Sequence, residues 1–174
     1  MKIGLCGTVS VGKSTLVKEL SKLKQFKDYD IATERSKYLR DQGILLNTDS
    51  TLKGQIIFSA ERSIELMKEK IITDRTIYDV IAFTLSAKSI SGTIKRKFFD
   101  LMLELRHEYD VIVYISPEGV EIEDNGIRET NAEYRTQIDI IIQELLKQYP
   151  PKKLIKINGG NPEDRIKTII SQIN

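Results

Sequence analysis

A glycine-rich segment near the start of the sequence carries the residue types that bind phosphate groups. Residues 7–14 read Gly-Thr-Val-Ser-Val-Gly-Lys-Ser, which is the pattern G-x-x-x-x-G-K-[ST] without a departure. The two glycines permit backbone angles and close approaches that a side chain would block, so the N–H groups of the loop can surround an anion. In loops of this kind the lysine reaches the β- and γ-phosphates, and the hydroxyl binds Mg²⁺. The residues expected to bind ATP are Gly7, Thr8, Val9, Ser10, Val11, Gly12, Lys13, Ser14 and Thr15.

Three further side chains stand where short apolar segments end. Glu34 follows residues 29–33, and Asp74 and Arg75 follow residues 70–73. A phosphoryl acceptor needs a carboxylate that orients its hydroxyl and takes the proton, Mg²⁺ needs a carboxylate, and the transferring group needs guanidinium donors. We therefore expect Glu34 to align the acceptor, Asp74 to hold the metal with Ser14, and Arg75 to clamp the acceptor or the phosphoryl group. The structural alternatives are a helix-dipole contact for Glu34 and an ordinary strand-end ion pair for the other two.

Two polar residues further along are candidates for contact with the acceptor. Lys37 follows Glu34 by three residues and shares its helix face. Gln55 lies on the side of Leu52 and Ile56 in a later predicted helix. An amide side chain can bind a base or a nicotinamide amide through two hydrogen bonds. The alternatives are a solvated lysine and a partly buried polar glutamine.

Residues 117–135 are expected to form a lid. The segment 117–130 has no apolar period and is acidic, with a turn signal near its middle. Arg128 and Arg135 lie seven residues apart, about two helical turns, so both guanidinium groups can point at the same sheet edge. We expect closure of this mobile lid to bring both arginines onto the ATP phosphates and to exclude water. The alternative is an acidic surface loop whose arginines neutralise their neighbours.

The elements that must position these residues follow from the hydrophobic pattern. Short apolar segments alternate with helical ones, which predicts an α/β fold: a three-layer sandwich around a five-stranded parallel sheet, with a lid segment. In such a sheet the carboxyl ends of the strands share one edge, where ligands bind. The predicted strands are 2–6, 29–33, 70–73, 109–116 and 153–157, and the predicted helices are 14–24, 34–42, 50–69, 76–86, 93–108, 131–148 and one beginning at Asn161.

Finer patterns refine three of these helices. In residues 50–69 one helical stripe contains Leu52, Ile56, Ala60, Ile64 and Met67. Thr76 with Asp79, and Thr130 with Glu133, fit the capping-box pattern. For Asp79 we favour this structural role over a catalytic one.

Length and composition exclude several classes of protein. The chain has 174 residues and a net charge of +2, which predicts a single domain, residues 1–174, without a strong polybasic character. Its one cysteine excludes a disulfide framework, and its one histidine excludes a multi-histidine metal site. No apolar run is long enough to span a membrane, and no leader pattern is present, so we expect a cytosolic protein that binds no membrane.

Other nucleotide-binding classes fit less well. An Asn-Lys-x-Asp motif, which a GTPase would normally carry, is missing from the sequence. An AAA-type motor usually needs an Asp-Glu pair that closes an apolar strand, as well as a helical lid domain, for which this length leaves no room. The carboxylates and arginines at the predicted strand ends instead indicate a small-molecule kinase.

With these residues in place, the chain resembles the P-loop kinases related to the ribosylnicotinamide-kinase domain of NAD-biosynthesis regulators. This AAA-type family of NAD metabolism is distantly related to deoxynucleoside and thymidylate kinases. Beyond the glycine-rich loop the resemblance depends on Glu34 with Lys37, Gln55, Asp74-Arg75-Thr76 with Asp79, and Asp124-Asn125-Gly126-Ile127-Arg128 followed by Glu133-Tyr134-Arg135. Lys37 stands where the group tends to have arginine, and Asp74-Arg75-Thr76 is closer to the thymidylate-kinase version, so the acceptor stays open.

We therefore expect an ATP- and Mg²⁺-dependent kinase that acts on a nucleoside or nucleotide. Lys13, Glu34, Asp74, Arg75, Arg128 and Arg135 are its expected catalytic residues, and Glu34, Lys37, Gln55 and Arg75 its expected acceptor contacts. One alternative keeps the chemistry but takes a hydroxyl of DNA or RNA, with the basic run 95–97 along the backbone; another is a regulatory module that senses a nucleotide without turnover. The oligomeric state is not determined by the sequence, and a homodimer stays open.

Overall fold

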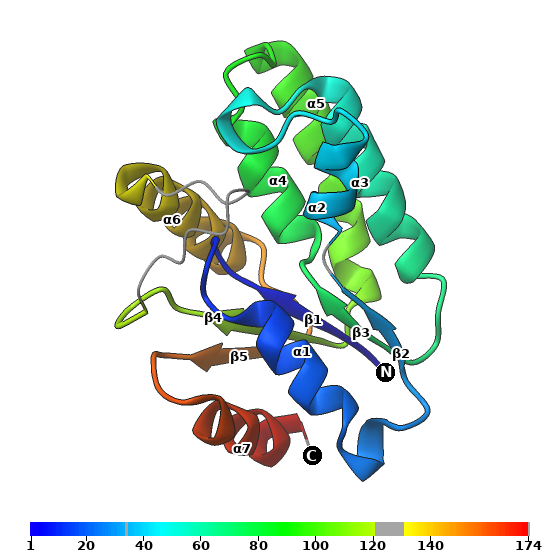
Figure 1. Cartoon of the computed structure of the whole chain (residues 1–174). Helices are drawn as coiled ribbons and strands as arrows, with labels where there is room; N and C mark the ends of the chain where they lie inside the picture. Colours follow the sequence, from blue (N-terminus) through cyan, green and yellow to red (C-terminus); the bar gives the residue numbers. More distant parts are fainter. Residues whose placement is uncertain (34, 121–130, 174) are drawn as a thin grey trace.

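A parallel sheet of five strands forms the centre of the computed structural model (Figure 1), which describes residues 1–33, 35–120 and 131–173. The strand order is β2-β3-β1-β4-β5, and every neighbouring pair is parallel. The strands are β1 (Lys2–Cys6), β2 (Asp30–Ala32), β3 (Ile71–Asp74), β4 (Val111–Ile115) and β5 (Leu154–Ile157). The expectation of a five-stranded parallel sheet is confirmed.

The middle of the sheet is buried on both faces. All residues of β3 and β4 are buried, and so are four of the five residues of β1. Their sequences are almost continuously apolar because helices cover both sides of a parallel sheet. Gly4 of β1 is needed for this packing, since a Cβ there would lie 2.5 Å from Thr76 Cγ2.

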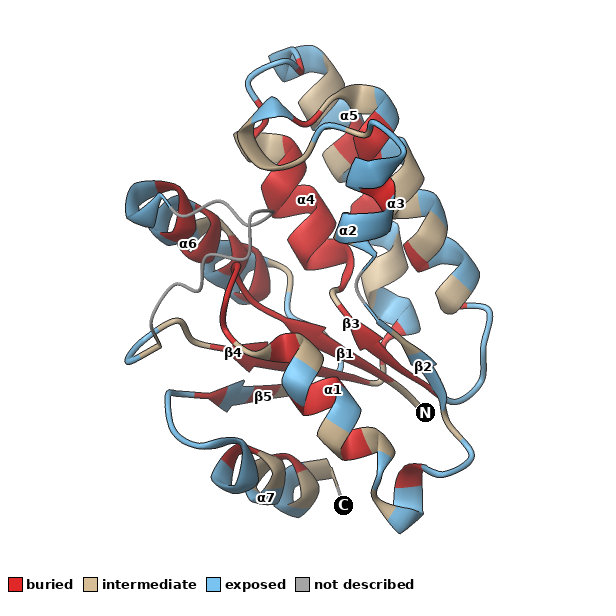
Figure 2. Ribbon diagram, viewed as in Figure 1, coloured by how far each residue is buried: buried red, intermediate tan, exposed pale blue. Residues whose placement is uncertain are grey.

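Helices cover both faces and complete the three layers (Figure 1). On one face α1 (Lys13–Ser21) and α7 (Pro162–Ile173) pack against each other and close one apolar core. The other face carries α3 (Leu52–Glu65), α4 (Ile77–Ser86), α5 (Gly92–Leu103) and α6 (Ala132–Gln148), which enclose the second core. The shorter helical segments are α2 (Ser36–Asp41), η1 (Lys24–Phe26), η2 (Asn47–Asp49) and η3 (Glu104–Glu108). Figure 2 shows that α4 is the most deeply buried helix of the second layer.

Helix α3 does not bury the stripe on which its prediction rested. Its buried residues are Gly54, Gln55 and Arg62, whereas Ile56 and Ile64 face solvent. Arg62 lies on the buried side of the helix, where its guanidinium binds Glu65 and donates to the carbonyl of Asp74. The helix is therefore correctly predicted, although most of the predicted stripe faces outward and only Leu52 of it packs against the core.

Two of the predicted helix starts are observed and one is corrected. Asp79 accepts a hydrogen bond of 2.8 Å from the N–H of Thr76, which forms the predicted capping box of α4. Asn161 accepts from the N–H of Asp164 at the start of α7. The N-cap of α6 is Asn131, because its Oδ1 accepts from the N–H groups of residues 133 and 134, and not Thr130 as the capping-box pattern indicated.

Among the described residues, no helix combines the length and the apolar character needed to cross a bilayer.

Candidate active site

The loop between β1 and α1 has a shape that its glycines make possible. Gly7 has a φ of 152°, and a Cβ there would lie 2.7 Å from the carbonyl oxygen of Ile115. Gly12 has a φ of 85° and is the N-cap residue of α1. Both positions require glycine. The loop consequently turns sharply out of a buried strand and ends at a helix N-terminus, the arrangement that binds anions.

Lys13 is enclosed within this loop. Its Nζ donates to the carbonyl oxygens of Gly7 at 2.5 Å and Thr8 at 2.7 Å, and it lies 4.0 Å from Asp79 Oδ1. Only 7% of the residue is exposed. Burial lowers the pKa of Lys13 below the ordinary lysine value, and the negative charge of Asp79 opposes this shift. The loop thus holds a cation at its centre.

Ser14 and Asp74 meet at the mouth of the loop. Ser14 Oγ donates to Asp74 Oδ2, and the carboxylate is buried at the end of β3. Its second oxygen, Oδ1, is buried without a hydrogen-bond partner in the described part of the chain. A hydroxyl and a carboxylate are oxygen ligands of the kind that Mg²⁺ takes together with substrate phosphates. The two residues expected to hold the metal are therefore in contact, and their chemistry fits it.

No larger metal cage accompanies this pair. Among residues 1–33, 35–120 and 131–173, no three His, Cys, Asp or Glu side chains are grouped so that they could hold an ion. Mg²⁺ is usually held by one or two carboxylates and completed by phosphate oxygens and water. The pair formed by Ser14 and Asp74 is consequently suited to a metal that arrives with phosphates.

Arg75 adopts an uncommon backbone conformation directly after β3. Its φ is 97°, a value that costs free energy in a residue with a side chain. Two hydrogen bonds fix it: its N–H donates to the carbonyl of Leu5, and its carbonyl accepts from Thr73 Oγ1. The guanidinium carbon then lies 4.7 Å from the centre of the Phe83 ring. The turn directs this cation away from the sheet and over the aromatic ring.

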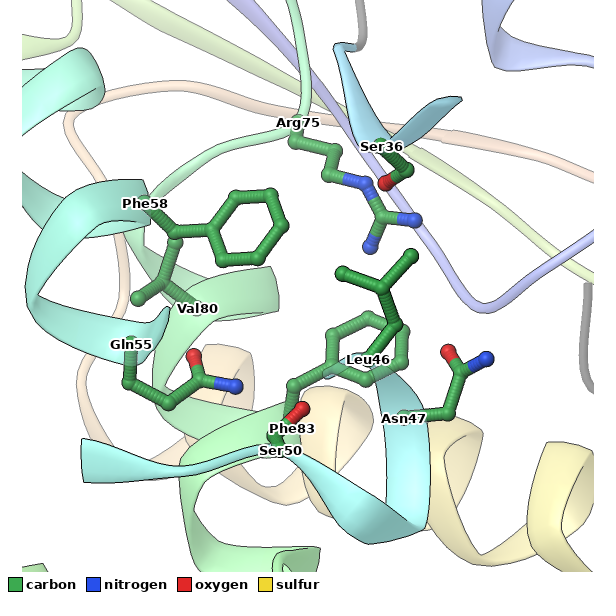
Figure 3. Close-up of a pocket in the computed structure, with 9 residues that line it drawn as sticks. All are labelled: Ser36, Leu46, Asn47, Ser50, Gln55, Phe58, Arg75, Val80 and Phe83. Carbon is green, nitrogen blue, oxygen red and sulfur yellow. The ribbon is translucent and has the colours of Figure 1, made fainter. Parts of the chain in front are cut away.

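Two adjoining cavities meet at Arg75. One is an open crevice of about 1220 Å³ along the loop, which includes Gly12, Lys13, Ser14 and Asp74 in its lining. The other is a smaller cavity between α3 and α4 (Figure 3), which measures about 340 Å³ with its open mouth included. The residues that line both are Ser36, Leu46, Asn47 and Arg75. A group bound in the small cavity therefore lies next to whatever occupies the loop.

The small cavity combines aromatic walls with a few polar groups. Phe58 and Phe83 provide the rings, and Figure 3 shows Arg75 and Gln55 pointing into the cavity from different sides. Gln55 is buried, and its Oε1 accepts a hydrogen bond of 3.2 Å from Thr84. This contact holds the amide at the cavity wall. Such a lining suits a flat, partly polar ring, which stacks on aromatic faces and bonds through its edge.

Three buried side chains hold the loop from behind. Asp79 Oδ1 accepts from the N–H of Gly7 at 3.2 Å, Arg135 Nε donates to the carbonyl of Val9 at 3.2 Å, and Arg165 Nη1 donates to the carbonyl of Val11 at 2.9 Å. From the sequence we expected Asp79 only as a helix cap, and Arg165 was not among the candidates. Its position on the apolar side of α7 could have indicated this contact, because a buried guanidinium needs a hydrogen-bond partner.

Arg135 contacts the backbone of the loop. It lies in the second turn of α6 and is 9% exposed. Its guanidinium donates to the carbonyls of Val9 and Val120, and burial lowers the pKa of Arg135. It contacts the loop through the loop's carbonyl oxygens and so acts on its shape. Residues 121–130 of the predicted lid, including Arg128, lie outside the described residues, and so does Glu34.

The remaining candidates separate into two groups. Lys37 is exposed and lines the crevice beside the loop. The basic run on α5 lies elsewhere: Lys95 donates to the carbonyl of Leu85, and Arg96 pairs with Asp100 at 3.3 Å. Two of its three cations are thus engaged within the chain.

Comparisons with known proteins agree with this architecture. The sequence model of the AAA domain family matches residues 2–165, nearly the whole chain. No curated protein matches the chain in sequence.

Among solved structures, deoxyadenosine kinase from M. mycoides with the products dCMP and dCDP has a TM-score of 0.70 at 22% identity, over 100% of this chain and 99% of that one. The same enzyme with bound dCTP gives a TM-score of 0.69 at 23% identity, again over 100% and 99%. Thymidylate kinase from Ehrlichia chaffeensis gives 0.67 at 16% identity, over 100% and 98%. At these identities the likeness shows the fold, which is that of the P-loop kinases. The resemblance to the ribosylnicotinamide-kinase group stays a prediction.

Proposed function

The chain belongs to the AAA domain family, and from this premise we propose that it is an ATP-dependent kinase that transfers a phosphoryl group to a nucleoside or nucleotide. The observation that carries the proposal is the junction at Arg75. The crevice along the phosphate-binding loop and the cavity with aromatic walls have four lining residues in common. A donor in the crevice and an acceptor in the cavity would therefore be neighbours. Transfer between two bound groups requires this proximity.

On the donor side, the loop contributes its N–H groups, the N-terminus of α1 and the ammonium of Lys13. All three attract negative charge. Ser14 and Asp74 would hold Mg²⁺, which supplies positive charge beside the β- and γ-phosphates. Because the loop is held by Asp79, Arg135 and Arg165, its donors need little rearrangement when a phosphate arrives. Such preorganised charge is the main source of catalysis in phosphoryl transfer.

On the acceptor side, the small cavity would hold a nucleobase between aromatic side chains, with Gln55 on its polar edge. The ribose or phosphate of the acceptor would then extend toward Arg75, whose guanidinium lines both cavities. Arg75 is therefore placed to stabilise the charge that develops on the transferring group.

The proton of an acceptor hydroxyl needs a base. Glu34 is the sequence candidate, directly after β2 and two residues before Ser36, which lines both cavities. We assign Glu34 to this role, and we assign Lys37, an exposed cation of the same crevice, to contact with the acceptor. A nucleotide acceptor, whose phosphate carries no such proton, would depend on Lys37 and Arg75 more than on Glu34.

The test is a panel of acceptors with product identification. The full chain is incubated with ATP, Mg²⁺ and, in turn, nucleosides, nucleoside monophosphates, nicotinamide riboside and oligonucleotides, and the products are identified by mass spectrometry. We expect one phosphoryl group to be added to a nucleoside or nucleotide. Lys13→Ala should lower the rate by roughly 10²-fold or more, because it removes a cation aimed at the phosphates. Lys24→Ala, at an exposed lysine remote from the loop, is the matched control.

Three results would contradict the proposal. Phosphorylation of oligonucleotides alone would indicate the polynucleotide alternative. Tight ATP binding without any phosphorylated product would indicate a sensing module. Near-normal transfer by Lys13→Ala would remove the loop from the reaction.

A further inference from the structure

Two buried polar side chains of the small cavity carry atoms that no described protein group satisfies. Gln55 is 2% exposed and Ser50 is 1% exposed, and both line the cavity. Within the described part of the chain, neither Gln55 Nε2 nor the hydroxyl of Ser50 has a hydrogen-bond partner. Figure 3 shows the amide nitrogen of Gln55 turned into the cavity. Because buried polar groups are nearly always hydrogen-bonded, these atoms indicate a ligand with a polar edge.

Thr84 holds the other end of the Gln55 amide. It lies on α4, is 1% exposed and is not one of the residues that line the cavity. Its hydroxyl donates to Gln55 Oε1 at 3.2 Å and to the carbonyl of Val80 at 2.8 Å, so its single proton is shared between two acceptors. The contact with Val80, one helical turn earlier, fixes the hydroxyl. Oε1 is thereby kept beside α4, and the amide presents its N–H groups to a ligand.

The order of donor and acceptor on this amide decides which nucleobase edge fits. A keto base carries a carbonyl oxygen next to a ring N–H, whereas an amino base carries an NH₂ group next to a ring nitrogen that accepts. A base that lies against Phe58 and Phe83, with its ribose toward Arg75, has one orientation, so its exocyclic group meets the same atom of Gln55 in every case. A carbonyl accepts from Nε2, but an amino group would set donor against donor and leave both unsatisfied.

We propose that Thr84 determines specificity by restricting the acceptor to keto bases, which are guanine, hypoxanthine, thymine and uracil. This inference rests on the proposed function, because it takes the small cavity as the base site of the acceptor. Thr84 acts through Gln55 and does not touch the substrate, so it is a positioning residue. Ser50 does not discriminate between the two classes, since a hydroxyl both donates and accepts.

Removing the hydroxyl of Thr84 should broaden the specificity. Valine has the shape of threonine without the hydroxyl, so in Thr84→Val the amide of Gln55 is free to turn by 180°. Oε1 then faces the ligand and accepts from an amino group. The variant should therefore gain affinity for amino bases and keep its affinity for keto bases, which a general loss of structure would not produce.

The test compares ligands that differ only at this edge: deoxyuridine with deoxycytidine, and deoxyinosine with deoxyadenosine, each as the nucleoside and as the 5′-monophosphate. Dissociation constants are measured by titration calorimetry of the full chain without ATP, and kcat/KM is then measured with ATP and Mg²⁺. We expect the parent to bind the keto member of each pair roughly tenfold to 100-fold more tightly. Thr84→Val should bring this ratio to about one, and Thr84→Ser, which keeps the hydroxyl, should retain it.

Ser50→Ala is the matched control, because it removes another hydrogen-bonding group from the same cavity. It should weaken both members of a pair equally and leave their ratio unchanged, and circular dichroism verifies that each variant folds. Equal binding of both members by the parent, preference for the amino member, a ratio that Thr84→Val does not change, or no binding of any of these ligands would overturn the proposal. Binding with the expected ratios but without phosphoryl transfer would support the role of Thr84 and contradict the proposed function.

Discussion

At the scale of single residues, the phosphate-binding loop depends on partners that are far away in the sequence. Its carbonyls at Val9 and Val11 accept from guanidinium groups that are 126 and 154 residues distant. Each arginine fixes a carbonyl on the outside of the loop and thereby keeps the neighbouring N–H groups available for phosphate. Arg165 is 7% exposed, and burial lowers its pKa. A buried cation of this kind is costly unless its hydrogen bonds are made, which argues for a role in the loop's shape.

Replacing Arg165 should therefore weaken donor binding more than it alters the chemical step. Arg165→Ala leaves the Val11 carbonyl without its donor, a cost of about 1–3 kcal/mol, and we expect the dissociation constant of ATP to rise roughly tenfold to 100-fold. Titration calorimetry with ATP measures this directly. Lys167→Ala, on the exposed side of the same helix, is the control. Unchanged ATP affinity in Arg165→Ala would show that the loop keeps its shape without this contact.

Gln55 should affect the other substrate. Gln55→Leu preserves the approximate size of the side chain and removes its polar atoms, so the acceptor loses a hydrogen-bonding edge while the donor site is untouched. We expect KM for the acceptor to rise roughly tenfold or more, with KM for ATP unchanged. Steady-state kinetics with each substrate varied in turn separates the two. An equal rise in both KM values would instead indicate general damage to α3.

At the scale of elements, local patterns predicted most of the architecture, and the exceptions have tertiary causes. The glycine-rich loop and the buried strand β4 were predictable because their signals lie within a few consecutive residues. The buried side of α3 carries Arg62, which donates to the carbonyl of Asp74, a contact that no local pattern contains. For the same reason the sequence did not indicate that Phe58 and Phe83, on two different helices, would line one cavity.

The N-terminus of α6 contains both a helix cap and an arginine that contacts the phosphate-binding loop. Asn131 caps this helix with two hydrogen bonds, and Arg135 stands one turn later. Asn131→Ala should lower the free energy of unfolding by about 1 kcal/mol, because it removes the cap, and Asn131→Asp should retain most of the stability. Urea denaturation followed by circular dichroism measures both. If Asn131→Ala is as stable as the parent, this helix does not depend on the cap.

At the scale of the whole molecule, one sheet edge gathers the loop, Asp74 and Arg75, while α3 and α4 enclose the adjoining cavity. Membership in the AAA domain family does not make this chain an AAA-type motor, a class of protein that its sequence fits poorly. Strand β4 is followed by Ser116 and Pro117, so it does not end in an Asp-Glu pair. The described ranges contain no separate helical domain. The basic run on α5 is partly engaged within the chain, which weakens the case for a polynucleotide acceptor. Glu34 and Arg128 stay predictions of the sequence alone.

The proposed function requires that the loop and the small cavity form one reaction site joined at Arg75. A dinucleoside polyphosphate that links adenosine to the nucleoside identified by the acceptor panel tests this most directly, since it can fill both cavities only if they are continuous. Initial-rate kinetics of the full chain are measured with this compound as the inhibitor. The structure predicts competitive inhibition against both ATP and the acceptor. Competition with ATP alone, with the acceptor still able to bind, would contradict the claim.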